Sequence, residues 1–212
     1  MSLDETPDLP RLRGRPRDPA RMARVLVAAR EHFSEVGFER GSMERIAAAA
    51  YVSKVTLYKY FPSKEALFNA IVTEPMRQAF DLDVAALDPA DPAAALERIA
   101  ETYLELITAP EILAHVRVLY ASVVTAPELG KSFFETGPEA LIQGLIRYLR
   151  LACLQGALAI DNAALAAEQF ASMVRGNEQI RLLAGQPALR AKAARKKYCQ
   201  SCVALFIKGY GP

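Results

Sequence analysis

Apolar residues recur three and four positions apart along almost the whole of this 212-residue chain, and no segment alternates apolar and polar residues as a half-exposed strand would. Between Asp18-Pro19 and Gly37 the apolar residues fall at the offsets of one helical face, with a cap and a proline at the start and a glycine at the end. The pattern predicts an all-α fold without a fixed-period repeat.

Prolines and glycines divide the rest of the chain into further helices. One starts at Lys64 and runs towards Phe80, and Pro75 is expected to bend or split it, because proline removes one backbone hydrogen bond. Residues 81–91 are expected to form a loop. The helices expected after that loop begin at residues 92, 110, 127 and 138, and the last two span 161–183 and 189–208.

Residues 42–68 are expected to fold as two short helices, a tight turn and the start of a third helix. Ser42, Ser53 and Ser63 can each cap one of these helices, because a serine hydroxyl accepts from the backbone N–H groups left free at a helix start. Two helices joined by about three residues form a helix-turn-helix, whose second helix enters the major groove of DNA.

The second of these helices, residues 54–61, has two distinct faces on a helical wheel. Leu57 and Phe61 lie together on the face that must meet the core, whereas Val55 and Lys59 lie roughly opposite. The outward face is small, basic and rich in hydroxyl groups, as a groove-reading face should be. An ordinary surface helix with two lysines would look the same, so the wheel alone leaves both interpretations open.

The motifs from residue 37 onward are more specific. Gly37-Phe38, Ile46-Ala47 and then the run VSKVTLYKYFPSKEAL, residues 52–67, resemble the DNA-binding domain of tetracycline-repressor (TetR) family regulators over about residues 20–72. The family usually has glycine at the turn position that Tyr51 occupies here. If the turn keeps a positive φ, a tyrosine there costs on the order of 1 kcal/mol, and otherwise the turn must be reshaped.

This resemblance implies which side chains meet DNA. Ser42, Tyr58, Tyr60 and Lys64 would hold phosphates. Val55, Thr56 and Lys59 would reach base edges, where a valine suits a thymine methyl group. The full set of predicted DNA contacts is Arg13, Arg15, Ser42, Arg45, Ser53, Lys54, Val55, Thr56, Tyr58, Lys59, Tyr60 and Lys64.

Charge is concentrated around the same region, although the net charge of the chain is only +2. Residues 11–64 hold twelve Lys and Arg against five Asp and Glu, which is the footprint of phosphate binding. Residues 1–17 lack an apolar period and are expected to form a flexible basic arm. Within it Arg13-Gly14-Arg15-Pro16 resembles an AT-hook core, which lays arginines in a narrow minor groove. A solvated basic tail is the alternative.

Residues 18–70 are therefore expected to form a DNA-binding domain of three helices, and residues 71–212 a helical domain for effector binding and dimerisation. The last two expected helices are apolar on more than one side, and such helices need more than one partner. The resemblance implies that they form a four-helix interface in a homodimer. A fully intramolecular core is the alternative.

Ligand sites in helical bundles lie between helices, with apolar walls and a few polar groups. The resembled family binds its inducers there, so we expect a small, largely apolar effector, and its binding should change the separation of the two DNA-binding heads. The residues expected around it are Tyr103, Leu119, Tyr120, Val123, Leu145, Phe170, Met173 and Asn177.

Other chemistry is weakly represented. The chain has no glycine-rich phosphate loop, nucleophile elbow or zinc-protease motif, so we expect no enzymatic activity, cofactor or metal. Cys199 and Cys202 form a CxxC pair without nearby histidines, which favours two small buried cysteines, although Lys196 and Lys197 leave a redox role open. There is no basic-then-apolar leader and no run of eighteen apolar residues, so a cytoplasmic protein without a membrane partner is expected.

Together these features predict a homodimeric transcriptional regulator, most simply a repressor that a small hydrophobic effector releases from double-stranded operator DNA. An architectural or nucleoid-type DNA-binding protein without an effector is the alternative. A helical ligand-binding module that binds no DNA is a third possibility.

Overall fold

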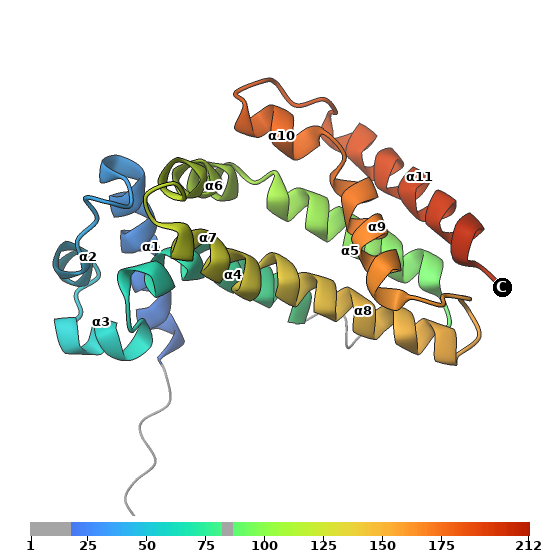
Figure 1. The fold of residues 1–212 in the computed structure, drawn as a ribbon, viewed down its shortest axis with the longest axis horizontal. Helices are drawn as coiled ribbons and strands as arrows, with labels where there is room; N and C mark the ends of the chain where they lie inside the picture. Colours follow the sequence, from blue (N-terminus) through green and yellow to red (C-terminus); the bar gives the residue numbers. More distant parts are fainter. Residues whose placement is uncertain (1–17, 82–86) are drawn as a thin grey trace, which may run out of the picture.

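The computed structural model describes residues 18–81 and 87–212, and helices span most of them (Figure 1). No strand occurs within these ranges, and the predicted all-α fold is confirmed. The helices are α1 Pro19–Val36, α2 Met43–Ala49, α3 Lys54–Tyr60, α4 Lys64–Asp81, α5 Pro92–Ile107, α6 Pro110–Ser122, α7 Pro127–Thr136, α8 Pro138–Leu154, α9 Ala163–Arg175, α10 Glu178–Leu183 and α11 Lys192–Tyr210.

The first helix begins and ends at the predicted signals. The Asp18 carboxylate accepts from the backbone N–H groups of Ala20 at 3.1 Å and Arg21 at 3.3 Å, so the start of α1 is capped. At the other end Gly37 has a φ of 78°, a left-handed conformation that glycine adopts without strain. Its N–H donates to the Phe33 carbonyl at 2.9 Å, and the chain then turns towards α2.

The N-terminal head consists of α1, α2, α3 and the first turns of α4, and it closes around three phenylalanines. The ring centroid of Phe68 lies 5.2 Å from those of both Phe33 and Phe38, each time edge to face. Phe33 and Phe38 lie 6.0 Å apart. All three side chains are buried. This cluster fixes α4 against α1 and against the loop between α1 and α2.

The fourth helix connects the head to the rest of the molecule. It runs from Lys64 to Asp81 without interruption, so of the two outcomes expected at Pro75, a bend or a split, the split is wrong. A proline costs the helix one hydrogen bond, but α4 continues through it and packs against α1, α7 and α8. The boundary expected between residues 70 and 71 falls inside α4, so the head and the second part share this helix.

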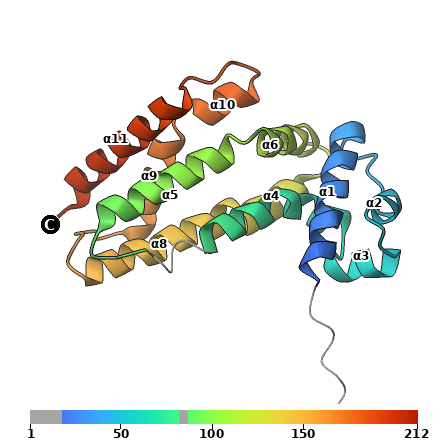
Figure 2. The ribbon, with the colours of Figure 1, turned by 180° about the vertical axis from the view of Figure 1, so that it is seen from behind.

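The second part, which we call the regulatory domain, is a bundle of helices that includes α5, α8, α9 and α11. Helix α9 packs against α5, α8 and α11, and α11 lies along α5 (Figures 1 and 2). Its core is apolar, with Leu96, Leu104, Leu149 and Phe170 all buried. Among the described residues no helix is long and apolar enough to cross a membrane.

One expected helix, residues 161–183, is broken in two. Helix α9 ends at Gly176, which has a φ of 47°, and α10 starts at Glu178. A Cβ atom on Gly176 would lie 2.6 Å from the hydroxyl oxygen of Tyr198, so a larger residue here would force the Tyr198 side chain to shift. The last helix begins at Lys192, three residues later than expected, and it ends at Tyr210.

The head is joined to the regulatory domain mainly through α6 and α7. The ring of His115 in α6 lies on that of Phe68 with centroids 3.8 Å apart. The Asn69 side-chain amide donates to the Leu129 carbonyl in α7 at 3.4 Å. The Thr125 hydroxyl, between α6 and α7, donates to the Glu39 carboxylate at 2.8 Å. A displacement of α6 or α7 would therefore act directly on the head.

Candidate DNA interface and ligand cavity

Serines start the two helices of the helix-turn-helix, as the sequence predicts. The Ser42 hydroxyl accepts from the Arg45 N–H at 3.3 Å, and the Ser42 N–H donates to Nε2 of His32 at 3.1 Å. The Ser53 hydroxyl accepts from the Thr56 N–H at 3.1 Å and lies 2.8 Å from the Thr56 hydroxyl. Both caps fix where each helix begins and so orient α3 against α2.

Helix α3 presents one face to the core and one to solvent. Leu57 and Phe61 are buried, whereas Val55 is 80% exposed and Tyr58 and Lys59 are also exposed. The two faces predicted from the wheel are therefore confirmed. Thr56 is half-buried because its hydroxyl lies against the cap of Ser53. The free strip on α3 is small enough to enter a major groove.

Lys54, at the start of α3, is held by an acid in the unbound protein. Its ammonium lies 2.5 Å from a Glu44 carboxylate oxygen and 5.8 Å from the ring centroid of Tyr58. The hydrogen bond from Lys54 lowers the pKa of Glu44 to about 2, and the same contact raises the pKa of Lys54. Both side chains are exposed, so a DNA phosphate would compete with Glu44 for this lysine. Arg45 is exposed nearby on α2.

Two residues expected at phosphates are engaged inside the head. The Tyr60 hydroxyl accepts from the Asp18 N–H at 3.1 Å, which ties α3 to the start of α1. The Lys64 ammonium donates to the carbonyls of Phe38 at 3.0 Å and Glu39 at 3.1 Å, and it lies 4.5 Å from the Phe38 ring centroid. The sequence carried no signal for these long-range contacts. Arg13 and Arg15 lie outside the described residues.

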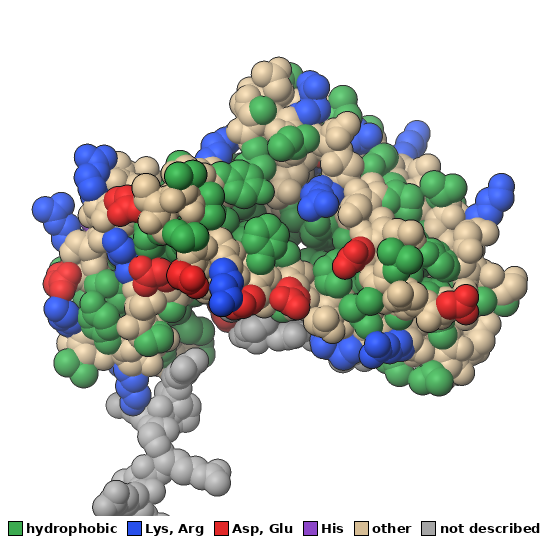
Figure 3. All heavy atoms as spheres, viewed as in Figure 1, with side chains coloured by type: hydrophobic (Ala, Val, Ile, Leu, Met, Phe, Trp, Pro, Cys, Tyr) green, Lys and Arg blue, Asp and Glu red, His purple; other side chains and the backbone are tan. Residues whose placement is uncertain are grey.

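A cavity of about 320 Å³ lies in the regulatory domain. Figure 3 views the molecule from a side on which apolar side chains gather around a hollow between α6 and α9. Most of its wall is apolar and four of its side chains are aromatic, while its polar side chains come from α9 and α10. The lining residues are Val72, Tyr103, Ile107, Ile112, Val116, Tyr120, Phe133, Phe134, Pro138, Leu141, Ile142, Glu168, Ala171, Ser172, Arg175 and Gln179.

The cavity includes only part of the predicted effector site. Tyr103 and Tyr120 line it, whereas Leu119, Leu145 and Phe170 are buried in the core and do not line it. Large apolar residues at helical spacing mark the core as readily as a ligand wall, so the spacing of these three does not distinguish the two roles. The remaining three predicted residues, Val123, Met173 and Asn177, also lie off the wall, and Asn177 is exposed at the start of α10.

Two tyrosine hydroxyls, from α5 and α6, add to the polar groups of this cavity. Burial raises the pKa of Tyr103, and the positive charge of Arg175 partly opposes the rise. Tyr103 is therefore a neutral hydroxyl that can donate or accept a hydrogen bond. Tyr120 lies 54% exposed at the wall and belongs to the same helix as Ile112 and Val116. An apolar ligand with a polar group at one end would match this distribution.

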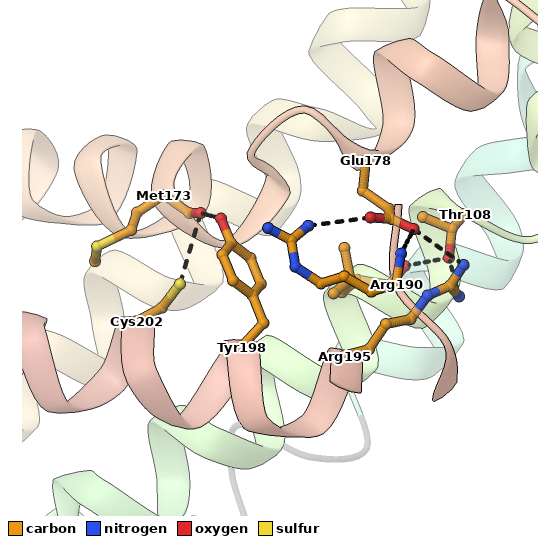
Figure 4. Close-up of polar contacts among 8 residues, drawn as sticks. Thr108, Met173, Glu178, Arg190, Arg195, Tyr198 and Cys202 are labelled. Atoms are coloured by element: carbon orange, nitrogen blue, oxygen red, sulfur yellow. Dashed lines mark hydrogen bonds and ion pairs between the residues drawn. The ribbon is translucent and has the colours of Figure 1, made fainter. Parts of the chain in front are cut away.

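A network of ion pairs and hydrogen bonds joins Glu178 to Arg190 and Arg195 (Figure 4). Glu178 is fully buried, and its carboxylate accepts from Arg190 at 3.1 Å and Arg195 at 3.4 Å. Arg195 also donates to the Thr108 hydroxyl at 3.1 Å. The neighbouring Gln179, which lines the cavity, donates to the Ile107 carbonyl at 3.2 Å. The network thus links α10, α11 and the end of α5 at one edge of the cavity wall.

The cysteines are placed as small core residues. Burial raises the pKa of Cys199 to about 11 and also raises that of Cys202, whose thiol donates to the Met173 carbonyl at 3.7 Å. A raised pKa disfavours the reactive thiolate. No group of three or more histidine, cysteine or acidic side chains suited to a metal ion occurs among the described residues.

Comparison with known proteins finds a match for the head and a second match for the regulatory domain. Residues 25–71 match the profile of bacterial regulatory proteins of the tetR family. Residues 94–212, more than half of the chain, match the profile of the C-terminal domain of AefR-like transcriptional repressors. The chain belongs to the TetR family. The two matched profiles describe transcriptional regulators and repressors.

Several TetR-family proteins resemble this chain over different lengths. The UidR regulator of Escherichia coli K12 is 48% identical over 56 residues, 26% of this chain and 29% of UidR. The LfrR repressor of Mycolicibacterium smegmatis is 37% identical over 108 residues, 48% of this chain and 52% of LfrR. This chain therefore spans only about a third to a half of these curated relatives, and the UidR match is a short one.

Two solved structures match nearly the whole chain. The flavonoid-responsive regulator FrrA is 34% identical, with a TM-score of 0.70, and the match covers 92% of this chain and 99% of FrrA. A TetR transcriptional regulator from Agrobacterium tumefaciens is 25% identical, with a TM-score of 0.72, over 92% of this chain and 95% of that one. The arrangement of head and regulatory domain is thus that of the TetR family.

The helix-turn-helix turn of this TetR-family head contains a residue with a strained backbone. Tyr51 has a φ of 54° and is the only residue other than glycine with a positive φ in the described part of the chain. Its N–H donates to the Ala48 carbonyl at 3.1 Å, and the Val52 N–H donates to the Ala47 carbonyl at 3.0 Å. The turn therefore keeps its left-handed residue, and the tyrosine tolerates a cost of about 1 kcal/mol.

Proposed function

We propose that this TetR-family protein is a homodimeric repressor that binds operator DNA through α3 and leaves it when a small, largely apolar ligand occupies the cavity. The observation that carries the proposal is the position of α4. Its Phe68 belongs to the aromatic core of the head, and Val72, one turn further on, lines the cavity. One rigid helix thus touches both the DNA-binding unit and the ligand site.

Base reading is assigned to the exposed strip of α3. Val55 and Lys59 project from α3, and Thr56 lies on its flank, where base edges would be met. Phosphate contact is assigned to the exposed polar groups around this strip. These are Ser42, Arg45, Ser53, Lys54 and Tyr58, with Arg13 and Arg15 of the arm. Tyr60 and Lys64 are assigned a different role, because their polar atoms already bind the frame of the head.

Dimerisation is assigned to the outer faces of α9, α10 and α11. Leu165, Ile180 and Leu205 are large apolar residues on these helices that remain exposed in the single chain. Ala194 and Ser201 lie exposed on the same side of α11 as Leu205, and such small residues let two helices approach closely. A twofold pair of chains would bury these residues and place two copies of α3 in successive major grooves.

The cavity favours a planar aromatic effector. Its wall contains Tyr103, Tyr120, Phe133 and Phe134, and aromatic rings stack on or pack edge-on against one another. Polar side chains of α9 and α10 would meet hydroxyl or carbonyl groups at one end of the ligand. FrrA is described as flavonoid-responsive, and a flavonoid, a flat apolar ring system with phenolic groups, has this chemistry.

Release of DNA requires that the ligand bind better to the arrangement of chains that cannot hold the operator. Helix α6 supplies Ile112 and Val116 to the cavity and His115 to the contact with Phe68. A ligand that displaces α6 would therefore shift the head through this ring contact and through α4. The two copies of α3 would then no longer match the spacing of two major grooves.

The experiment starts from DNA that the purified protein enriches from a random duplex pool. Affinity for this duplex and for its scrambled version is measured at several salt concentrations, with and without a hydroxylated flavone. We expect a preference for the enriched duplex and a loss of affinity on adding the flavone. Equal affinity for both duplexes would instead indicate an architectural DNA-binding protein, and no binding to either would remove the DNA-binding half of the proposal.

A matched pair of variants tests the ligand half. Phe134 and Leu154 are both exposed, so neither alanine variant should disturb the core, but only Phe134 lines the cavity. Phe134→Ala should weaken flavone binding several-fold and leave operator binding intact, whereas Leu154→Ala should change neither. If no aromatic compound binds wild type or alters the operator complex, the effector half of the proposal is wrong while the DNA half stands.

A further inference from the structure

Tyr51 occupies a position of the helix-turn-helix turn at which a side chain lowers the stability of the fold. Its φ of 54° is a left-handed conformation that glycine, and to a lesser extent asparagine, adopts at lower cost. Both backbone hydrogen bonds of the turn come from N–H groups, of Tyr51 itself and of Val52, which a glycine at position 51 would supply equally well. The tyrosine side chain therefore adds nothing to the turn.

Contacts within the chain do not offset the strain either. The Tyr51 side chain is 90% exposed, more than that of any other large apolar or aromatic residue in the described part of the chain. Its neighbours in sequence, Ala50 and Val52, pack inward, whereas Tyr51 points to solvent. A strained residue with an exposed side chain is a mark of function, because strain persists where it serves binding.

The position of Tyr51 next to α3 indicates which part of a bound DNA its side chain would contact. It lies two residues before Ser53, the cap at the start of α3, and four before Val55, the most exposed large apolar residue of α3. Ser53 and Lys54 are exposed beside it. A side chain at this place stands at the rim of the surface that enters the groove, where the sugar–phosphate backbone passes rather than the base edges.

We propose that Tyr51 is a DNA-contact residue of this chain, whose hydroxyl donates a hydrogen bond to a backbone phosphate while its ring packs on the adjacent sugar. This inference rests on the proposed DNA-binding function. It assigns a role to a side chain that the backbone hydrogen bonds of the turn do not need. The contact adds affinity for any duplex and little sequence preference, since phosphates carry no direct sequence information.

A tyrosine contact differs measurably from a lysine contact. Tyrosine is neutral, so it binds phosphate without releasing a condensed counterion, and its loss should leave the salt dependence of binding unchanged. Loss of Lys59, an exposed cation on α3, should lower the salt slope by about one unit. The slope of DNA affinity against salt concentration therefore distinguishes a tyrosine contact from a lysine contact.

The test compares Tyr51→Gly, Tyr51→Asn and Tyr51→Phe with wild type, on the enriched duplex and on its scrambled version. Glycine and asparagine relieve the strained φ, so neither should lower the melting temperature, and asparagine should raise it. Both should weaken binding to the two duplexes by a similar factor of about 3 to 10, the loss of one or two modest contacts. Tyr51→Phe keeps the ring and should lose part of that factor. The salt slope should stay that of wild type.

Three results would overturn the inference. Unchanged affinity in Tyr51→Asn would mean that the side chain touches no DNA. A lower melting temperature in both Tyr51→Gly and Tyr51→Asn would mean that the tyrosine holds the turn. A loss confined to the enriched duplex would mean base reading instead of a backbone contact. Failure of wild type to bind either duplex would contradict the proposed function itself, and that outcome is visible before any variant is made.

Discussion

The head and the regulatory domain begin their helices in different ways. All four helix starts of the head carry a side-chain cap, from Asp18, Ser42, Ser53 and Ser63, each within three residues of the N–H it binds. In the regulatory domain Asp91 and Asn162 cap α5 and α9 in this way, but α6, α7, α8, α10 and α11 have no such cap.

The regulatory domain instead uses arginines that reach across the sequence. Arg195 binds Thr108 and Glu178, while Arg117 donates to the carbonyls of Leu182 and Leu183 at the end of α10. The long-range bonds of the head, from Tyr60 and Lys64, stay within the head, so together with the caps they keep its shape when its surroundings move. The arginine bonds of the regulatory domain join separate helices and break when those helices part. The head is thus suited to move as one body, and the regulatory domain to deform around a ligand.

The largest expected loss of stability follows from removing Glu178, which binds two of the arginines of the regulatory domain. Its carboxylate is fully buried between Arg190 and Arg195, and removing one member of a buried ionic group leaves uncompensated charge. The two arginines are partly exposed and can be rehydrated, so Glu178→Ala should cost about 3 kcal/mol of unfolding free energy, at the low end for such changes. Thermal denaturation measures it.

A second ion pair on α11 supplies the control. Lys196 and Glu101 lie 3.9 Å apart, and both side chains are well exposed. Lys196→Ala should therefore cost less than about 0.5 kcal/mol. If both variants melt alike, the Glu178 network does not hold the regulatory domain together, and the contrast between the two domains is weakened.

The next effect concerns the joint between the two domains and acts through pH. Burial lowers the pKa of His115 from 6.5 to about 3, and the charge of Arg30 adds to the shift. The unfolded chain therefore binds more protons than the folded one between these values, so stability falls as the pH drops below 6.5. At pH 5 the loss should reach about 2 kcal/mol.

His115→Phe isolates this contribution. Phenylalanine keeps a ring on Phe68 but cannot be protonated, so its melting temperature should vary less between pH 7 and pH 5 than that of wild type. An equally steep decline in the variant would show that groups other than His115 cause the acid sensitivity. Protonation at the contact between His115 and Phe68 would then destabilise the fold no more than protonation elsewhere in the molecule.

A smaller effect distinguishes bracing of the head from DNA contact at Lys64. Lys64→Met keeps the apolar stem and removes two hydrogen bonds to backbone carbonyls, which should cost about 1 kcal/mol of stability at this half-exposed site. The salt slope of DNA binding should stay unchanged, whereas Lys59→Met should lower it by about one unit without loss of stability. A lower slope in Lys64→Met would restore the phosphate contact expected from the sequence.

The contrast between local caps and long-range contacts also explains which features the sequence could predict. The cap of Asp18 and the burial of Leu57 depend on residues within a turn or two, and both follow from residue type and spacing. Phe170 and Phe134 look alike in sequence, yet one is fully buried and the other is 56% exposed at the cavity wall. That difference depends on which helices meet, and this information is absent from helical periodicity.

Failures of prediction fall where distant segments decide the outcome. The break at Gly176 lies where the Tyr198 hydroxyl of α11 leaves no room for a Cβ atom, and α4, which packs against α1, α7 and α8, continues past residue 75. Lys64 is a typical surface lysine by sequence, and only the fold brings it to the carbonyls of Phe38 and Glu39. Long-range contacts of this kind have no local signature.

The smallest expected effect is chemical modification of the cysteines. Cys199 and Cys202 are buried, and burial raises the pKa of both thiols, so they should react with iodoacetamide far more slowly than the half-buried Cys153. Mass mapping after brief labelling should find the label on Cys153, and Cys153→Ser should then leave the folded protein nearly unlabelled. Operator affinity should not change on labelling, since no cysteine lies in the head. Rapid labelling of Cys199 or Cys202 in native protein would mean that α11 separates readily from its neighbours. A redox role for the CxxC pair, which the buried geometry argues against, would then be open to test by measuring operator affinity before and after oxidation.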